Sequence, residues 1–263
     1  MAPDKPLLLH GDCMELLSTL PEHSVDFICC DPPYGITTAP WDKGLDWANV
    51  WEELNRVCTP NGVVALFASN RFSFELYNTN PACWRYKWIW LKPQGTDFLN
   101  SRLKPLNNTE DILVFYTGKP GKTWYEPQKT YGHSKRINLR RKGSKTPCIW
   151  GGGRVLHTPY VNTDGSRYPV QTIKVNTVPT STRIHVSQKP VELLELLIKS
   201  HCPPGGTVLD FCMGSGSTGV AALQCGRRFI GIELDEKYYK NACAAIERAA
   251  ASLPTILMET DNA

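Results

Sequence analysis

The tetrapeptide Asp31-Pro-Pro-Tyr34 carries residue types that could hold and activate an aromatic amine. The Asp31 carboxylate and the Pro32 carbonyl can each accept one N–H, and the two prolines, Pro32 and Pro33, remove competing backbone donors. Two such acceptors draw an amine nitrogen toward tetrahedral geometry and favour its attack on an electrophilic methyl group. Tyr34 can stack on the ring of the same molecule, a contact worth about 1–3 kcal/mol. The alternative is a structural Pro-Pro loop in which Asp31 caps a turn.

A second candidate site is the glycine-rich turn from Gly214 to Thr218, between an expected strand and an expected helix. Glycines there let the backbone turn tightly and approach a ligand beside a helix N-terminus. About 20 residues further on, Glu233 ends the next strand, where its carboxylate could accept hydrogen bonds from ribose hydroxyls. No Gly-Lys-Ser/Thr follows, so the turn is not a P-loop. These features suit a dehydrogenase as well as a methyltransferase, and a plain structural turn is the other alternative.

Both candidate sites follow expected strands. Apolar runs of strand length predict strands over residues 7–10, 25–30, 63–68, 86–91, 111–116, 207–211 and 228–233. Helical spacing of apolar residues predicts helices over residues 14–20, 47–58, 191–201, 217–225 and 236–251. This alternation predicts an α/β fold with a doubly wound, mostly parallel sheet. Asp31 then lies at the carboxyl end of a parallel strand, where such sheets place ligands.

The composition is that of a soluble globular protein, with 263 residues of which 41% are hydrophobic and 21% charged. No apolar run approaches the roughly 18–20 residues that cross a bilayer, and Met1-Ala-Pro-Asp-Lys5 does not resemble a signal peptide. The ten cysteines are irregularly spaced without a C-x-x-C pair, so we expect reduced thiols and no metal site. A cytoplasmic protein with no membrane association is the resulting expectation.

The charge is unevenly distributed along the chain. The net charge is +4, but residues 119–189 carry 14 lysines and arginines against only two acids, Glu126 and Asp164. Such a basic segment suggests a polyanionic partner, with a solvated basic loop as the alternative. From Gly118 to about Ser187 the sequence is rich in Gly, Pro, Ser and Thr, which predicts an irregular insertion or a small subdomain. We expect its aromatic residues to form a small core, with stacking on bases as the alternative: Trp124, Tyr125, Tyr131 and Trp150.

Taken together, these segments resemble the amino-methyltransferase family of DNA-modifying enzymes, in the permuted beta group whose catalytic motif precedes the cofactor motif. Asp31-Pro-Pro-Tyr34 is similar to the catalytic motif, and Leu209-Asp210 through Thr218 is similar to the cofactor loop. His185-Val-Ser-Gln-Lys189-Pro190 resembles the segment that helps to hold the methionine end of the cofactor. Phe229-Ile-Gly-Ile-Glu233 resembles the ribose-binding strand, and His10-Gly-Asp12-Cys13 resembles the segment whose acid contacts the adenine.

The resemblance implies a seven-stranded Rossmann-like methyltransferase fold that uses S-adenosyl-L-methionine. Residues 1–117 would form its catalytic half, 118–184 a target-recognition insertion, and 185–263 its cofactor-binding half. The implied catalytic residues are Asp31, Pro32, Pro33 and Tyr34. The implied cofactor-binding residues are Asp12, Cys13, Asp31, His185, Ser187, Lys189, Asp210, Phe211, Cys212, Gly214, Ser215, Gly216, Ser217, Thr218, Glu233 and Leu234. The family usually has Pro-Phe where this chain has Phe211-Cys212, so we assign this loop a backbone role.

In this group of enzymes a motif that starts with Asp is found mostly in N6-adenine enzymes, and one that starts with Ser mostly in N4-cytosine enzymes. Asp31 therefore indicates N6 methylation of adenine in double-stranded DNA, with the target base flipped out of the duplex at a cost of a few kcal/mol. The alternatives are cytosine N4, an RNA base, or a non-catalytic DNA-binding protein that keeps the fold.

The same resemblance suggests where and with what the protein works. It implies a prokaryotic or phage-infected cell, and a restriction-modification context in which a cognate restriction endonuclease would be a separate chain. Relatives are often dimers, which makes a homodimer a further expectation. The candidate DNA contacts lie in the basic segment: Arg136, Arg140, Arg141, Lys142 and Lys145.

Overall fold

The computed structural model describes residues 5–35, 42, 44–118, 121–138, 160–185 and 187–253. The chain divides into two compact units. The first unit comprises Met1–Glu126 and Gln171–Ala263, and the second comprises Pro127–Val170. The large unit is therefore built from both ends of the chain, and the small unit is inserted between them in the sequence.

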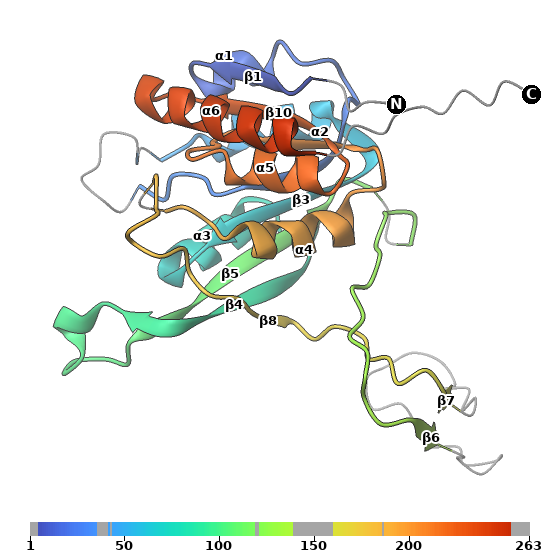
Figure 1. Cartoon of the computed structure of the whole chain (residues 1–263). Coiled ribbons are helices and arrows are strands. Elements are labelled where there is room, and N and C mark those ends of the chain that lie inside the picture. Colours follow the sequence, from blue (N-terminus) through green and yellow to red (C-terminus); the bar gives the residue numbers. More distant parts are fainter. Residues whose placement is uncertain are drawn as a thin grey trace, which may run out of the picture. The chain divides into compact units, whose positions relative to one another are not determined.

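The described part of the first unit contains one eight-stranded sheet with the order β1-β10-β9-β2-β3-β5-β4-β8 (Figure 1). Its strands are β1 (Leu7–His10), β2 (Val25–Cys30), β3 (Cys58–Ala68), β4 (Trp84–Thr96), β5 (Asn107–Tyr116), β8 (Thr172–Lys174), β9 (Thr207–Asp210) and β10 (Arg228–Glu233). Only β5 runs antiparallel to its neighbours, β3 and β4. The predicted mostly parallel α/β fold is thus confirmed.

The number of strands differs from the prediction of seven. The additional strand, β8, lies in the segment for which we expected irregular structure, and it pairs in parallel with β4 from Ile89↔Thr172 to Leu91↔Lys174. Strand β8 has three residues, and Ile173 is its one buried side chain. Such a short segment gives no recognisable strand pattern in the sequence.

Helices cover both faces of the sheet. On one face lie α1 (Cys13–Leu17), α2 (Trp47–Val57) and α3 (Asn70–Thr79), which bury Leu17, Leu54 and Leu76. On the other face lie α4 (Val191–His201), α5 (Ser217–Gln224) and α6 (Glu236–Ser252), which bury Leu197, Ala221 and Ile246. Figure 1 shows these last three helices side by side, in orange to red. This three-layer arrangement buries the sheet on both faces and leaves its strand ends for a site.

Helix α3 was not predicted from the sequence. Its backbone enters through Asn70 at φ 52°, and its buried residues are only Phe72, Ser73 and Leu76. A helix of ten residues with so few apolar positions gives a weak periodic signal. The sheet face beneath it, which Leu113 and Phe115 help to form, supplies the packing that stabilises it.

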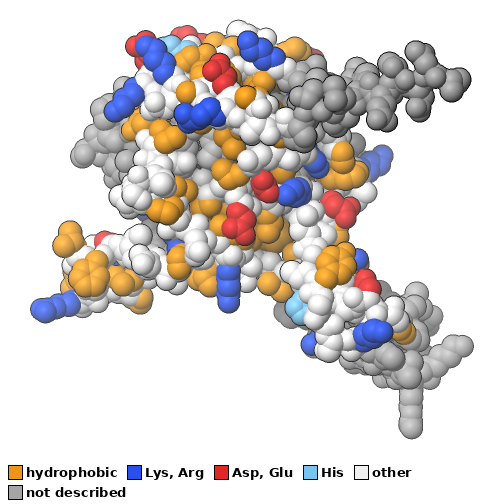
Figure 2. All heavy atoms as spheres, viewed as in Figure 1, with side chains coloured by type: hydrophobic (Ala, Val, Ile, Leu, Met, Phe, Trp, Pro, Cys, Tyr) orange, Lys and Arg blue, Asp and Glu red, His pale blue; other side chains and the backbone are white. Residues whose placement is uncertain are grey.

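The β4–β5 hairpin carries exposed apolar side chains between its strands. The short 3-10 helix η1 (Phe98–Asn100) lies there, and Phe98, Leu99 and Leu103 are 76%, 97% and 84% exposed. Figure 2 shows hydrophobic side chains gathered at the end of this hairpin, at the lower left. Large apolar side chains exposed together are typical of a surface that contacts another molecule.

The second unit contains a two-stranded antiparallel sheet of β6 (Arg136–Asn138) and β7 (Tyr160–Asn162). Arg167 stabilises it by donating to the backbone carbonyls of Ser134 and Ser166 and to the Asn162 side chain. Gly165 has φ 67°, and a Cβ atom there would lie 2.4 Å from the His133 carbonyl oxygen, so this turn requires glycine.

The expectation that aromatic residues form a core in this region is wrong for the described ones. Trp124 and Tyr125 belong to the first unit, and both are exposed, as is Tyr131 in the second unit. Trp150 lies outside the described residues. In the described part of the second unit, hydrogen bonds such as those of Arg167 connect its segments.

None of the described helices is long and apolar enough to cross a membrane. The cysteines of the described ranges are free thiols. Across the same ranges, no group of three or more His, Cys, Asp or Glu side chains is arranged to hold a metal ion.

We expect the buried His201 to make the free energy of unfolding depend on pH. Its ring lies among Phe27, Tyr86 and Trp88, and burial lowers its pKa to about 3. Between that value and the ordinary histidine pKa the unfolded chain binds one more proton, so the folded state loses about 1.4 kcal/mol per pH unit as pH falls. Urea titrations of the wild type and His201→Gln between pH 4 and 7 should show a shallower slope in the variant. Parallel slopes would contradict this account of His201.

Candidate active site

Four neighbouring strands of the sheet end at acidic residues. Asp12 is the second residue after β1, and Asp31 is the first residue after β2. Glu233 and Asp210 are the last residues of β10 and β9. These strands are adjacent in the order β1-β10-β9-β2 and run in parallel, so their carboxyl ends lie along one edge of the sheet. Open α/β sheets bind ligands at this edge. The fold thus brings together segments from the beginning and the end of the chain.

The Asp31 carboxylate is held on both of its oxygens. Oδ2 accepts a hydrogen bond from Lys189 Nζ at 2.6 Å, and Oδ1 accepts one from the Tyr34 hydroxyl at 2.9 Å. Burial raises the pKa of Asp31, the positive charge of Lys189 lowers it, and the negative charge of Glu110 raises it again. The Tyr34 ring stacks on Phe72 of α3 at a centroid distance of 4.5 Å. An unpredicted helix therefore supports the predicted catalytic motif.

Lys189 lies between two carboxylates. Its Nζ atom is 2.6 Å from Asp31 Oδ2 and 2.8 Å from Glu110 Oε1, and it lies over the Phe67 ring at 4.8 Å. Burial lowers the pKa of Lys189, but Asp31 and Glu110 raise it by more, so the ammonium stays protonated. The resemblance assigned this side chain to the cofactor; the structure places its ammonium on the catalytic motif.

Glu110 continues the ion pairs to a second lysine. Its Oε2 atom is 2.7 Å from Lys92 Nζ, and Glu110 and Lys92 come from the paired strands β5 and β4. Burial raises the pKa of Glu110, but Lys189 and Lys92 lower it by more, so its net pKa lies below the usual value. We call Lys92, Glu110, Lys189 and Asp31 the charged row. Its formal charges alternate and cancel, which is what allows four ionised groups to share a largely buried place.

The glycine-rich turn is joined to Glu233. The Gly214 N–H donates to Glu233 Oε2 at 2.8 Å, and the Asp235 N–H donates to Oε1 at 2.8 Å. Gly214 and Gly216 have φ angles of 51° and 76°, and a Cβ atom on Gly216 would lie 2.9 Å from Ala242 Cβ on α6. Both conformations suit glycine. The turn and the carboxylate at the end of β10 therefore form one rigid structure.

Asp210 lies next to this turn and is fully buried. Its Oδ1 atom accepts a hydrogen bond from the Cys212 N–H at 3.1 Å. Burial raises the pKa of Asp210 to about 6, against hydrogen bonds from Thr218 and Cys212 that lower it. The Cys212 thiol interacts with the Cys13 and Cys30 thiols.

His185 and Asp12 both come before the turn in the sequence. The Ser187 N–H donates to His185 Nδ1 at 3.1 Å, and the ring meets Tyr238 edge-on at 4.3 Å. Burial and then the charge of Lys189 lower the pKa of His185, so its ring is neutral. Asp12 caps α1, because its Oδ1 atom accepts from the Met14 N–H at 2.8 Å.

The remaining predicted cofactor residues fall into two environments. Ser215 lies in the turn, and Ser217 and Thr218 open α5, all three buried beside Gly214. Phe211 is buried in the apolar cluster on the α1–α3 face, whereas Leu234 is 56% exposed after β10. Phe211 is thus a packing residue in this structure, and Leu234 is the more accessible of the two.

Of the predicted DNA contacts, Arg136 lies at the start of β6 in the second unit and is exposed. Arg140, Arg141, Lys142 and Lys145 lie outside the described residues.

The sequence did not single out Glu110 or Lys92. A usable signal was the pair Glu110-Asp111 at the start of an apolar strand, since alternate strand residues face opposite sides. Ile112 and Val114 pack in the cluster beneath α4–α6, and Leu113 packs in the other cluster. Glu110 therefore faces the same side as Ile112, beneath α4–α6, where a buried carboxylate needs a charged partner.

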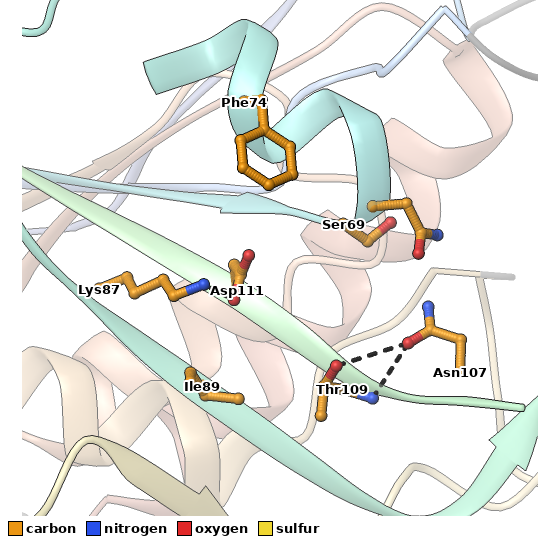
Figure 3. A pocket seen from close by; sticks show the side chains of 8 residues that line it. Ser69, Phe74, Lys87, Ile89, Asn107, Thr109 and Asp111 are labelled. Atoms are coloured by element: carbon orange, nitrogen blue, oxygen red, sulfur yellow. Dashed lines mark hydrogen bonds and ion pairs between the residues drawn. The ribbon is translucent and has the colours of Figure 1, made fainter. Parts of the chain in front are cut away.

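On the opposite face of β4 and β5, a hollow of about 270 Å³ is lined by residues that include Phe74 of α3. Figure 3 shows the side chains of Lys87 and Asp111 pointing toward one another there. They form an ion pair in which Nζ and Oδ1 are 2.9 Å apart. This hollow is at the small end for a ligand pocket, which usually measures about 300–1,000 Å³. None of the predicted catalytic or cofactor residues lines it.

Comparisons with known proteins agree with this geometry. A protein-family model described as DNA methylase (N6_N4_Mtase) matches residues 25–245. The Escherichia coli (strain K12) protein YubD is 29% identical over 255 residues, covering 92% of this chain and 91% of its own. The type II methyltransferase M.ScaI of Streptomyces caespitosus is 24% identical, with 94% of this chain and 83% of its own covered.

Solved structures share the fold. The M1.HpyAVI–SAM complex matches with a TM-score of 0.60 at 22% identity, covering 92% of this chain and 99% of that one. TTHA0409 of Thermus thermophilus, complexed with S-adenosyl-L-methionine, matches with a TM-score of 0.55 at 21% identity, covering 95% and 98%. The cytosine-N4-specific PvuII DNA methyltransferase matches with a TM-score of 0.59 at 15% identity, covering 94% and 93%. The Rossmann-like methyltransferase fold is thereby confirmed.

Removing the shared lysine should destabilise the protein strongly. Lys189→Met leaves Asp31 and Glu110 as buried carboxylates without their common cation, a loss of about 3–5 kcal/mol. Urea unfolding at pH 7.5 measures it. Lys87→Met, which breaks the more exposed pair with Asp111, should cost about 1 kcal/mol or less. Equal stability of Lys189→Met and the wild type would contradict the burial of the charged row.

Proposed function

We propose that this chain methylates adenine at N6 in duplex DNA. The proposal starts from its family: the chain belongs to the DNA methylases, whose family model matches residues 25–245. At the level of the family it is an S-adenosylmethionine-dependent DNA methyltransferase that modifies an exocyclic amine of adenine or cytosine. Asp31 at the start of the catalytic motif supports adenine. Cytosine N4 is the alternative target, since its amine presents similar chemistry to a carboxylate.

The carboxyl edge of the sheet fits S-adenosylmethionine as the methyl donor. Glu233 and Asp12 offer carboxylate oxygens that can accept from ribose hydroxyls and from an adenine amine. The positive φ angles of Gly214 and Gly216 bring the backbone close to this edge without a Cβ atom in the way. The neutral His185 ring lies beside Gly214, and Lys189 is one of the charges that act on it. When bound, the cofactor supplies an electrophilic methyl group on a sulfonium.

The position of Asp31 supports this function most directly. Oδ2 is held by Lys189, while the one described residue that donates to Oδ1 is Tyr34, whose hydroxyl is a neutral donor. An exocyclic N–H can take the place of that hydroxyl, and the Pro32 carbonyl can accept the second N–H. Together they draw the amine nitrogen toward tetrahedral geometry. Because burial raises the pKa of Asp31, Oδ1 can also take the proton that the methylated amine releases.

Tyr34 must then change partners when a base binds. Its ring stacks on Phe72 and its hydroxyl occupies Asp31 Oδ1. As the base displaces the hydroxyl, the ring is available for stacking on the flipped base, worth about 1–3 kcal/mol. This contact offsets part of the few kcal/mol that flipping costs.

Target recognition belongs, in this proposal, to residues 118–184. The segment from 119 to 189 carries the excess of positive charge, and the exposed Arg136 of β6 belongs to the compact second unit. Arginine and lysine contact phosphates, and arginine can also read guanine edges. A homodimer and a separate cognate endonuclease stay predictions from the resemblance.

Asp31→Ala should abolish methyl transfer while the enzyme still binds the cofactor. We expect a loss of about 10³-fold or more in single-turnover transfer of labelled methyl groups to DNA, because the amine loses its charged acceptor. Calorimetry should give a cofactor Kd within about threefold of the wild type, a margin of less than about 1 kcal/mol. Asp111→Ala, on the opposite face of the sheet, is the matched control. Wild-type turnover by the Asp31 variant would exclude the proposed catalytic role.

The modified base can be identified directly. DNA from a methylation-free host that expresses the protein should contain N6-methyladenine at one short motif, seen by sequencing with modification detection and by nucleoside analysis. N4-methylcytosine in its place would transfer the proposal to the alternative base. Unmodified DNA, with cofactor bound by the purified protein, would favour a DNA-binding protein without catalysis or an RNA substrate.

A further inference from the structure

Two residues of the charged row are joined to Asp31 through the Lys189 ammonium. Lys92 is on β4 and Glu110 on β5, and their side chains are 18% and 7% exposed. Glu110 Oε1 reaches Lys189 Nζ at 2.8 Å, and Lys189 reaches Asp31 at 2.6 Å. The row thus links two strands in the half of the sheet beside α3 to the residue proposed to hold the target amine.

We propose that Glu110 and Lys92 are positioning residues for methyl transfer, which act through Lys189 to orient the Asp31 carboxylate so that Oδ1 faces the target amine. The inference rests on the proposed catalytic role of Asp31 and extends it to two residues that touch neither base nor cofactor.

The need for Glu110 follows from the chemistry of lysine. An ammonium carries three donors on a flexible four-carbon stem and does not fix the orientation of a single partner. Glu110 holds the opposite side of the Lys189 ammonium, and the Phe67 ring lies against it. Lys92 in turn holds the other oxygen of Glu110. Each group therefore restrains the next, and the rigid β4–β5 pairing at Trp90↔Glu110 fixes the far end of the row.

The row also sets the charge around Asp31. The groups that act on Asp31 are Lys189, Glu110 and the Tyr34 hydroxyl, and the neighbouring ionisable groups are Asp210 of β9 and the thiols of Cys29 and Cys30 on β2. Glu110 raises the pKa of Asp31, so its neutralisation should lower that pKa. Lys92 lowers the pKa of Glu110 and balances its charge. Without Lys92, the negative charge of Glu110 is no longer balanced by a second cation. Its effect on Asp31 then increases, and the pKa of Asp31 should rise.

Stability alone does not account for the row. A buried ion pair is often matched or exceeded in stability by well-packed apolar residues of similar volume. The neighbouring positions on the same strands, Trp90 and Ile112, are apolar and buried. Apolar side chains like these could also have filled the positions of the four ionised groups. A requirement for a fixed carboxylate at the edge that holds Asp31 explains why charged groups are there instead.

The test uses the full-length variants Glu110→Gln and Lys92→Met in single-turnover methyl transfer between pH 5 and 9. We expect the rate at its optimum to fall about 10- to 100-fold, as for a small misplacement of a reacting group, with KM for DNA and Kd for the cofactor within about threefold. The acid limb of the pH profile should move to lower pH in Glu110→Gln and to higher pH in Lys92→Met. Lys92→Arg, which keeps the charge, should restore the wild-type limb.

Asp111→Asn and Lys87→Met are the matched controls. They remove the same charges from the same two strands, in the ion pair on the α3 side of the sheet (Figure 3). Their acid limbs should coincide with that of the wild type. Thermal unfolding of every variant shows which are folded at the assay temperature, and if Glu110→Gln is not, Lys92→Met and Lys92→Arg carry the test.

Acid limbs that stay in place, or that move in the same direction in Glu110→Gln and Lys92→Met, would overturn the proposal. Failure of the proposed function gives a different result, namely full turnover by an Asp31 variant. An inactive Asp31 variant together with unmoved limbs would retain the methyltransferase mechanism and leave Glu110 and Lys92 with a structural role.

Discussion

Burying the Lys189 ammonium at the edge of the sheet would cost several kcal/mol without charged partners, and two carboxylates on either side of it offset that cost. The geometry of the site depends on this interaction. It fixes one oxygen of Asp31 and leaves the other to a neutral hydroxyl that a substrate amine can replace. It also joins the segment before α4 to β2 and β5, and so connects the two sequence-distant halves of the first unit.

The order of the strands makes this connection possible. The first strand, β1, pairs with the last, β10, and β2 pairs with β9, so the N-terminal catalytic motif lies next to the C-terminal glycine-rich turn. Asp12, Glu233, Asp210 and Asp31 then lie along one edge although they come from opposite ends of the sequence. A chain whose catalytic motif precedes its cofactor motif can form such a site only because parallel strands from both ends share one sheet.

Much of this could be predicted from the sequence, for reasons that differ between residues. Asp31 and the turn at Gly214 were recognisable because a buried strand precedes each of them, and strand ends are local features. Glu110 and Lys92 were not, because their importance depends on which face of β4 and β5 is covered and on a lysine far away in the chain. Helix α3 and strand β8 were missed because tertiary packing and pairing, rather than local pattern, stabilise them.

The role of Asp31 Oδ1 is tested most directly by a crystal structure of the protein with a non-reactive analogue of S-adenosylmethionine and a DNA duplex that contains its target. We expect a flipped base with its exocyclic nitrogen within hydrogen-bond distance of Asp31 Oδ1, Tyr34 stacked on the base, and Lys189 still on Oδ2. A base bound at this edge while the Tyr34 hydroxyl stays on Asp31 Oδ1, or with Lys189 withdrawn from Oδ2, would contradict it.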